Sequence, residues 1–381
     1  MLLLTIALQA GIVAASPASS TDIVVTATRL REALEQCQQG GCSVRRDAQV
    51  SIAAAEQLFR AGDYGKARSI LFASIARNRD HAAEEPRPVA ALYEAYATVS
   101  IHFGDPAAYR RGVSRQVRTL RDHLPQDDPS VLAADFVAAD QWIQARKFHQ
   151  ADQTLDAAAR RSEAIGKTRW SAIATLHRAA LAASLGSERR AEEFLKAARA
   201  KGADDAVVSR LARIVELRIA ADKGDDARID SLVRTVGNDP RNKRSLVWAP
   251  PYPLDPAAAA NTPDAFQQQS SARVEQSSQL SVAWVDVGFW IAPDGRTRQV
   301  EVLRGSRSQK WVSAMLTQVA ARRYAASADG VELPGDYRIE RFSWRAPLGY
   351  VTGSNARQRV SAPELQVLDL TAPSATVTVT R

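Results

Sequence analysis

Apolar residues recur with helical spacing along most of the first 236 residues, and short turns that contain glycine interrupt the pattern. The segment from Ala54 to Leu71 shows this arrangement in full, because one apolar stretch ends at Gly62-Asp63 and a second begins directly after it. An apolar stripe at three- and four-residue spacing indicates an amphipathic helix. Glycine readily adopts the left-handed backbone that ends a helix. The pattern therefore predicts pairs of helices joined by tight turns.

The turns recur at a nearly constant distance. Successive separations are 42, 42, 40 and 38 residues, taking as equivalent points Gly62, Gly104, Arg146, Gly186 and Gly224. A period near forty residues is typical of stacked helical hairpins, each of which buries its inner face against its neighbours. Small residues are expected where the two helices of a hairpin cross, at Ala67, Ala151 and Ala191. Residues 47–236 are therefore interpreted as an all-α helical-repeat solenoid.

After residue 280 the apolar period changes from helical to alternating. Val285, Val287, Phe289 and Ile291 share one face of a predicted strand, and the following Pro-Asp-Gly predicts a turn into a second strand. A helix is predicted over 308–323 and a third strand over 336–344. The fold class expected for the whole chain is α+β.

Two segments flank this alternating region. Residues 237–279 are rich in proline, alanine and glutamine, so they are interpreted as a linker, with Trp248 and Tyr252 packing on the helices. Residues 346–381 form a polar, loosely patterned tail. A domain this small needs large side chains to fill its interior. Most of its tryptophans are therefore expected in the core, the candidates being Trp284, Trp290, Trp311 and Trp344. The alternative is that one of them on the solvent side of a strand, Trp284 or Trp290, anchors a partner.

The order strand, Pro-Asp-Gly turn, strand, helix, strand resembles the C-terminal domain of the TonB energy-transducer family. Asp286-Val287-Gly288-Phe289 and Arg322-Arg323-Tyr324 carry the resemblance, which spans residues 282–344. It implies a small ββαβ domain at 280–345 that acts in the periplasm by lending a strand edge to a partner. In that family the last strand accepts the partner, and the matching edge here is Asp336, Tyr337, Arg338, Ile339, Glu340, Arg341 and Phe342. The Gly-Asp-Tyr-x-x-Ala turn of the helical region likewise resembles tetratricopeptide repeats.

The N-terminal 46 residues indicate export. Residues 1–15 are apolar and end in small residues, so they are interpreted as a signal peptide, with an uncleaved membrane anchor as the alternative. Residues 16–46 form a leader in which Cys37 and Cys42 are expected to close a disulfide loop. Part of the leader resembles the TonB box of outer-membrane receptors, and the alternative is an ordering strand or a disordered leader. The box-like residues are Asp22, Ile23, Val24, Val25, Thr26 and Ala27.

Composition and charge exclude several classes of function. The net charge is +8, but only eight of the fifty basic residues are lysine and no basic stripe with interleaved aromatic residues is evident, so no nucleic-acid partner is expected. The histidines are not spaced as metal ligands. The acidic pairs Asp127-Asp128, Asp204-Asp205 and Asp225-Asp226 lie at or just before predicted helix starts, where they act as caps. No catalytic constellation, cofactor, metal or small-molecule substrate is indicated.

These observations together favour a non-enzymatic periplasmic interaction protein. Its helical repeats would serve as a scaffold, and its C-terminal domain would bind protein partners by strand addition, TonB-dependent outer-membrane receptors among them. One alternative is a membrane-anchored energy transducer of the TonB type. Another is an enzyme or cell-wall-associated factor with a site that the sequence does not reveal. The box-like segment 22–27 is further expected to pair with the edge at 336–344, in the same molecule or in a neighbour.

Overall fold

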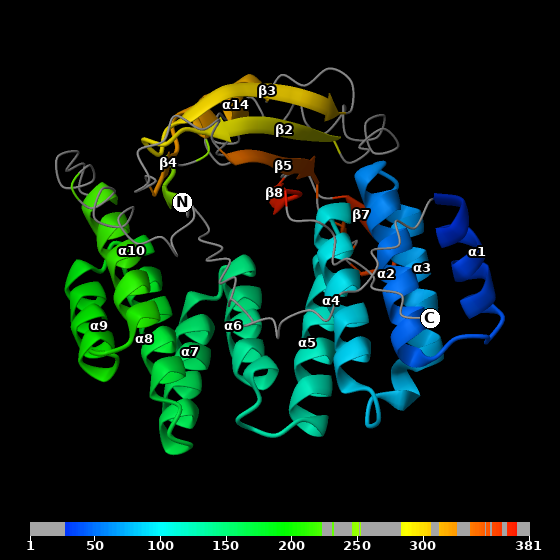
Figure 1. The fold of residues 1–381 in the computed structure, drawn as a ribbon, viewed down its shortest axis with the longest axis horizontal. Coiled ribbons are helices and arrows are strands. Elements are labelled where there is room, and N and C mark those ends of the chain that lie inside the picture. The colour runs from blue at the N-terminus through cyan, green and yellow to red at the C-terminus, as the bar shows by residue number, and fades with distance from the viewer. Residues whose placement is uncertain are drawn as a thin grey trace, which may run out of the picture. The chain divides into compact units, whose positions relative to one another are not determined.

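Helical repeats are followed by a small antiparallel sheet, so the chain is α+β (Figure 1). The computed structural model describes residues 27–222, 231, 246–250, 252, 283–305, 312–325, 336–346, 348–350, 353–359 and 364–371. They divide into two compact units, 27–138 and 139–371, with the division inside helix α6 (Pro129–Gln144). None of the helices in these described ranges has the length and apolar character needed to cross a membrane.

Helices follow one another in antiparallel pairs in both units (Figure 1). The first unit contains α1 (Ala27–Gln38), α2 (Val44–Arg60), α3 (Tyr64–Asn78), the short 3-10 helix η1 (Arg79–His81), α4 (Pro86–Phe103) and α5 (Pro106–His123). The second contains α7 (Phe148–Ala164), α8 (Thr168–Ser184), α9 (Glu188–Lys201) and α10 (Ala206–Asp222). The predicted helical hairpins are thus confirmed. Ala67, Ala151 and Ala191, expected at the crossings, are all fully buried.

The turn within each hairpin uses the same backbone device. The φ angles at Gly62, Gly104, Arg146 and Gly186 are +84°, +88°, +56° and +73°. At each turn the next amide donates to the carbonyl five residues earlier, as Asp63 N does to Leu58 O at 2.9 Å and Lys147 N to Trp142 O at 2.9 Å. This bond defines a Schellman helix end, which needs a left-handed residue. The equivalence predicted from the spacing is therefore confirmed at these four points, whereas Gly224 lies outside the described residues.

Arg146 is the one position of these four where a side chain occupies the left-handed conformation. Replacing it with glycine should relieve the strain and stabilise the protein by about 0.5–1 kcal/mol. Left-handed backbone costs a non-glycine residue roughly 1–2 kcal/mol, and the larger conformational entropy that glycine loses on folding offsets part of the gain. The equivalent change Gly104→Ala should destabilise by about 1 kcal/mol or more. Urea unfolding of the two variants checks this, and a lower midpoint for Arg146→Gly would contradict it.

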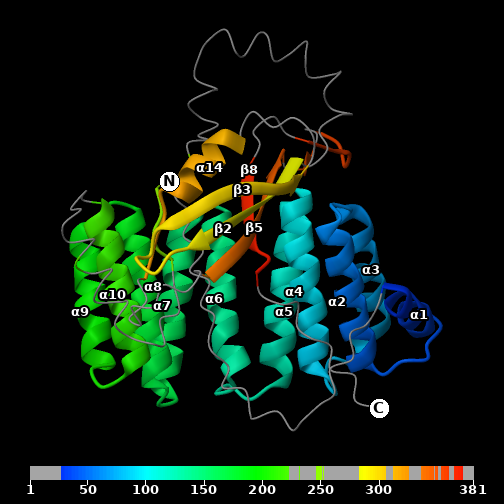
Figure 2. The ribbon, with the colours of Figure 1, turned by 45° about the horizontal axis from the view of Figure 1, so that its top comes forward.

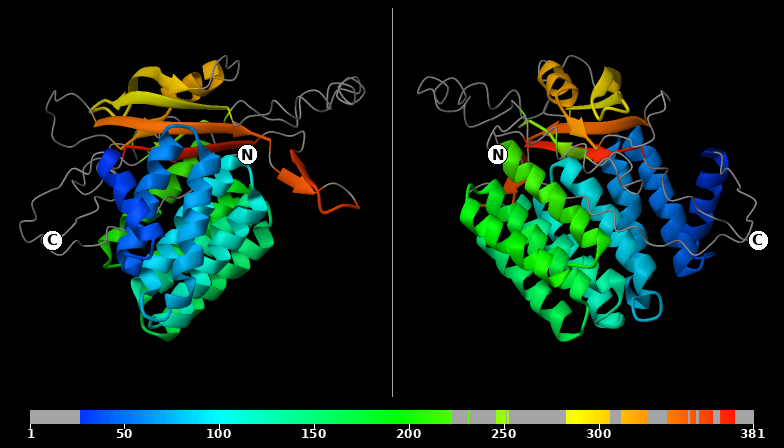
Figure 3. Two further views of the ribbon diagram at one scale, coloured as in Figure 1. Left: turned by 90° about the vertical axis from the view of Figure 1, so that its right-hand side faces the viewer. Right: turned by 60° about the vertical axis from the view of Figure 1, so that its left-hand side comes forward.

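The second unit also carries the sheet, whose strand order is β3-β2-β5-β8, all neighbours antiparallel (Figure 2). The strands are β2 (Ala283–Ile291), β3 (Thr297–Gly305), β5 (Asp336–Arg345) and β8 (Glu364–Asp369). Helix α14 (Val312–Ala320) lies on one face of this sheet, which Figure 3 shows edge-on. Two further two-stranded ladders join β1 (Leu246–Trp248) to β4 (Arg323–Tyr324) and β6 (Leu348–Tyr350) to β7 (Arg357–Arg359).

The core of the sheet region combines aliphatic side chains with the aromatic rings of Phe289, Tyr324 and Phe342. Val285, Val287, Phe289 and Ile291, which form the predicted face, are each at most 2% exposed. They pack against Met315 and Val319 of α14 and against Tyr324 and Phe342. The tryptophans do not form this core, which corrects the expectation. Trp284, Trp290 and Trp344 are only half-buried, and Trp311 lies outside the described residues. Trp284 and Trp290 sit at even positions of β2, on the opposite face from the valines, because alternation separates the two sets.

Two segments interpreted as linker and tail contribute to the sheet region. Strand β1 comes from the predicted linker, and Tyr252 packs against Phe342 with ring centroids 6.2 Å apart rather than on the helices, so that expectation is wrong for Tyr252. Strand β8 comes from the predicted tail and adds a fourth strand to the expected ββαβ arrangement. Both segments are too short to show a clear period, since three to six residues hold at most a few alternations.

Candidate functional site

The outer border of β5 is the candidate partner-binding edge, and the structure shows it paired. On one side β5 pairs with β2 along nine residues, from Asp336↔Ile291 to Trp344↔Ala283. On the other side Glu340–Arg345 pair with β8, and Ile339 O accepts from Leu370 N at 2.8 Å. The edge expected to be open at Ile339, Glu340, Arg341 and Phe342 is therefore covered by the chain's own strand. The ββαβ order implied by the resemblance contains three strands, so it does not predict this fourth strand.

Alternate side chains of the predicted edge point to opposite faces of the sheet. The face that carries α14 contains Arg338, Glu340 and Phe342, with Asp336 exposed at its end. The opposite face contains Tyr337, Ile339 and Arg341. The predicted residues thus form one strand with two separate side-chain environments. A partner would reach their backbone only along the side of β5 away from β2, which the chain's own residues 364–370 cover from Ile339 onward.

A buried polar cluster surrounds Glu340 on the face of α14. Arg322 donates from Nη1 to both oxygens of the Glu340 carboxylate, at 2.9 and 2.7 Å, and from Nη2 to the hydroxyl of Tyr252 at 3.1 Å. Burial alone would lower the pKa of Arg322, but Glu340 raises it above its ordinary value. Burial, with the charge of Glu340, raises the pKa of Tyr252 to about 12. Through Arg322, the cluster links Tyr252 to Glu340 of β5.

A second buried ion cluster lies on the opposite face, where three neighbouring strands meet. Asp286 of β2 accepts from Arg341 of β5 at 2.6 and 2.9 Å and from Arg304 of β3 at 2.6 Å. The Asp286 and Arg341 side chains are fully buried, and the Arg341 guanidinium lies 3.8 Å from the centroid of the Trp284 ring. The buried charges are thus paired and hydrogen-bonded, and the cluster connects side chains of β3, β2 and β5.

On the same face the side chain of Tyr337 lies so close to the backbone of β2 that only glycine fits at position 288. A Cβ at this position would lie 2.0 Å from the hydroxyl oxygen of Tyr337, so a side chain there cannot coexist with the present position of that ring. Tyr337 packs on Trp290, with ring centroids 5.0 Å apart. Burial, together with the nearby charge of Glu301, raises the pKa of Tyr337. Tyr337, which was predicted to contact a partner, is thus half-buried against its own sheet.

Both β2 and β8 pair with β5, but β8 is the more exposed of the two and buries fewer of its residues. None of its six residues is buried, and Val367 is 36% exposed, whereas five of the nine residues of β2 are buried in succession. Leu365 packs at the margin of the core. Glu364 and Asp369, at the two ends, lie 3.4 Å from Arg345 and 3.6 Å from Arg338. The backbone ladder with its two flanking ion pairs therefore supplies most of the attachment.

The other predicted residues lie in the first unit or outside the described chain. Cys37 and Cys42 form the expected disulfide, which joins the end of α1 to the segment before α2. Of the box-like segment, Asp22, Ile23, Val24, Val25 and Thr26 lie outside the described residues. Ala27 begins helix α1, so the segment does not continue as a strand, because the following Thr-Arg-Leu-Arg-Glu-Ala-Leu-Glu is a good helix-forming sequence.

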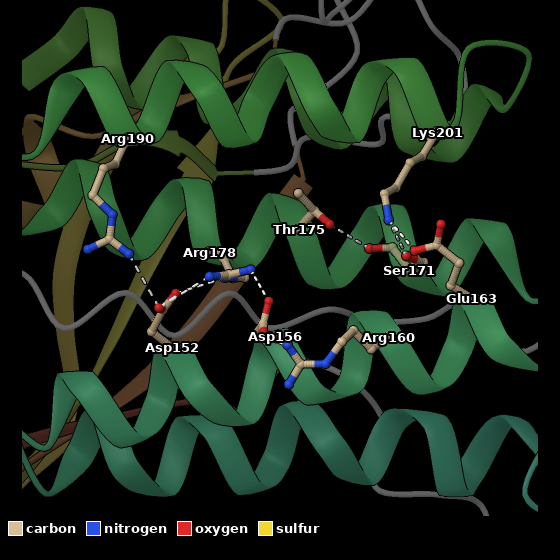
Figure 4. A network of polar contacts seen from close by, with 9 residues as sticks. All are labelled: Asp152, Asp156, Arg160, Glu163, Ser171, Thr175, Arg178, Arg190 and Lys201. Carbon is tan, nitrogen blue, oxygen red and sulfur yellow. Dashed lines mark hydrogen bonds and ion pairs between the residues drawn. The ribbon is translucent and has the colours of Figure 1, made fainter.

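Arginine–carboxylate pairs connect helices of consecutive repeats in each unit. Near the start of the first helix of a hairpin an arginine pairs with an acid that precedes the next such helix, 36–41 residues later; the pairs are Arg45–Glu85, Arg87–Asp128 and Arg169–Asp205. Within the second unit, Arg178 of α8 binds Asp152 and Asp156 of α7, and Arg190 of α9 also reaches Asp152 (Figure 4). Arginine here serves to hold one helix beside another.

Buried carboxylates in the repeats serve as structural anchors. Asp47 accepts hydrogen bonds from Arg77, Asn78 and Ser51. Burial alone would raise the pKa of Asp47, but these bonds together lower it. Asp205 caps α10 by accepting from the amides of Val207 and Val208. The described residues hold no group of three histidine, cysteine, aspartate or glutamate side chains that could bind a metal ion.

No protein-family model matches the chain, and no curated protein matches it. Among solved structures, the chain is similar to a crystal structure described as a Podosopora anserina kinesin light chain with nearly identical TPR-like repeats. The two are 15% identical, and the match covers 49% of this chain and 91% of that chain, with a TM-score of 0.38.

Proposed function

We propose that the protein is a non-enzymatic interaction protein whose C-terminal sheet binds an extended segment of a partner along the outer border of β5. The observation that carries this proposal is that the border of β5 already pairs with a strand. The chain's own β8 occupies it as a short, regularly paired and exposed antiparallel strand. A border that accepts one such strand offers the same backbone donors and acceptors to another.

The contacts of β8 also describe the partner segment. Two apolar residues, Leu365 and Val367, stand opposite Trp344 and Phe342, and acids at both ends lie near arginines. An incoming strand would therefore carry alternate apolar residues between acidic ends. The box-like segment of the leader shares part of this pattern, since Asp22 is followed by apolar residues at the next and third positions, although Val24 stands where β8 has the polar Gln366. Receptors that present a TonB box are accordingly the partner class we propose.

Competition between β8 and added peptides tests the proposal. The probe is a fluorescent peptide of residues 363–371, offered to the full chain and to a chain that ends at residue 362. The shortened chain should bind it at least about tenfold more tightly, since a tethered strand competes at high effective concentration. A second peptide of residues 20–29 tests the box-like sequence. A control peptide with proline at both 366 and 367 should not bind, because one of these amides must face the ladder.

Equal affinity of the full and shortened chains, or equal binding of the proline peptide, would contradict strand addition at β5. Thermal unfolding of the shortened chain, compared with that of the full chain, verifies that the sheet remains folded. We further propose that the helical repeats act as a scaffold and that the protein works in the periplasm. Fractionation of cells that express a C-terminally tagged chain tests the location. A membrane-bound product that retains residues 1–15 would instead support the anchored transducer.

A further inference from the structure

Helix α5 carries a row of arginines on its exposed side. Arg110, Arg111, Arg115 and Arg118 are all exposed, and none of them forms an ion pair with a residue that the structure describes. The opposite side of the helix is packed, with Gly112, Val113, Gln116, Val117 and Leu120 buried. Helical spacing brings these four arginines to one face of α5. They form the arginine face of α5.

This face differs from the other second helices of the hairpins. On α7 and α9 the exposed arginines Arg160 and Arg189 pair with acids four residues away on the same helix. On α5 itself, Arg121 pairs with Asp135 of the next helix. Arg160, Arg189 and Arg121 thus each pair with an acid. By contrast, α5 contains no acidic residue between Pro106 and Arg121.

The spacing places like charges next to one another. Arg111, Arg115 and Arg118 lie four and three residues apart, so their side chains neighbour each other on the helix surface and repel. An anionic group on a partner would remove this repulsion and add charge-assisted hydrogen bonds, since a guanidinium binds carboxylates through two parallel N–H donors. The row spans roughly 10 Å, the length of two turns of a helix.

We propose that the arginine face of α5 binds an acidic helix of a partner protein, with carboxylates at the spacing of Arg111, Arg115 and Arg118. The molecule already joins helices in this way, through arginine–carboxylate pairs such as Arg45–Glu85. A membrane surface is disfavoured because α5 has no exposed large apolar side chain to insert. A single-stranded nucleic acid is disfavoured because no exposed aromatic ring on α5 offers a stacking surface.

The test uses the full chain and defined probes. A helical peptide with glutamate at its first, fifth and eighth positions is compared with the same peptide carrying glutamine. The glutamate peptide should bind about tenfold more tightly. The double variant Arg111→Glu/Arg115→Glu should remove this preference. The matched control Arg189→Glu/Lys196→Glu on α9 changes the net charge of +8 by the same amount and should keep the preference.

Further arms separate the alternatives. Arg111→Lys/Arg115→Lys retains the charge and should bind the glutamate peptide a few-fold more weakly than the unaltered chain. Vesicles of phosphatidylcholine with 30% phosphatidylglycerol and a 20-nucleotide single strand serve as the other anionic probes. Equal loss in both charge-reversal variants, equal binding of the two peptides, or tighter binding of vesicles or nucleic acid than of the glutamate peptide would overturn the proposal.

Discussion

Asp286→Ala should destabilise the C-terminal sheet by about 3–5 kcal/mol, because it removes the carboxylate from a buried guanidinium. Arg341 is fully buried and directs two hydrogen bonds at that carboxylate. Taking away one member of a buried pair leaves the other without its counter-charge in a medium of low dielectric constant. Urea unfolding followed by tryptophan fluorescence measures the loss, since Trp284, Trp290 and Trp344 lie in β2 and β5.

Arg304→Gln is the matched control for this prediction. Arg304 binds the same carboxylate at 2.6 Å, but its side chain is 49% exposed, so its removal should cost about 1 kcal/mol or less. The double variant Asp286→Val/Arg341→Met removes both buried charges and should be more stable than Asp286→Ala alone. A loss for Asp286→Ala no greater than that for Arg304→Gln would show that the buried pair does not hold the sheet together.

The helical part of the fold was accessible to prediction because its signals are local. A turn at Gly62-Asp63 is specified by residues within one helical turn, and its bond from Asp63 N to Leu58 O spans only five residues. The constant spacing of such turns then fixes the hairpins. Even Arg146, which lacks glycine's freedom, was identified as a turn from its position in the repeat, and its φ of +56° confirms that placement.

The candidate site was less accessible, because alternation shows which residues share a face but not which strand lies beside them. The face of Val285 and Phe289 was predicted correctly. The partner of Glu340 across the border is Asp369, which lies in a six-residue strand with only two alternate apolar residues. Likewise the Asp286 cluster assembles residues from three strands, and Arg341 lies 55 positions away along the chain. Neither arrangement leaves a local pattern.

The pairing of β5 with β8 also changes how the box-like leader is understood. The leader was expected to cover the edge, and a covering strand exists, but it is Glu364–Asp369. Any strand that binds β5 in the proposed way must therefore replace an existing ladder and gain only the difference between two similar sets of hydrogen bonds. Selectivity would then come from the side chains opposite Phe342 and Trp344 and from the flanking arginines. This favours a reversible interaction over a permanent one.

Stability of the helical repeats should depend on pH through Asp140 of α6. Burial raises the pKa of Asp140 from 3.8 to about 7. Between these two values the folded chain holds a proton that the unfolded chain has released, so unfolding free energy should fall as pH rises from about 4 to 7 and then level off. Asp140→Asn mimics the protonated form and cannot titrate. It should stabilise the protein by about 2–4 kcal/mol at pH 8 and leave it nearly unchanged at pH 4.

Urea unfolding across pH 4 to 8 measures this difference. Asp122→Asn is the control, because Asp122 is exposed on α5 and forms no ion pair that the described part of the chain contains. The gap between Asp140→Asn and the unaltered chain should open with rising pH, whereas the Asp122→Asn curve should run parallel to that of the unaltered chain. A gap of constant size would mean that Asp140 is ionised in the folded protein throughout this range, and its burial would then require a cation close to it that compensates the charge.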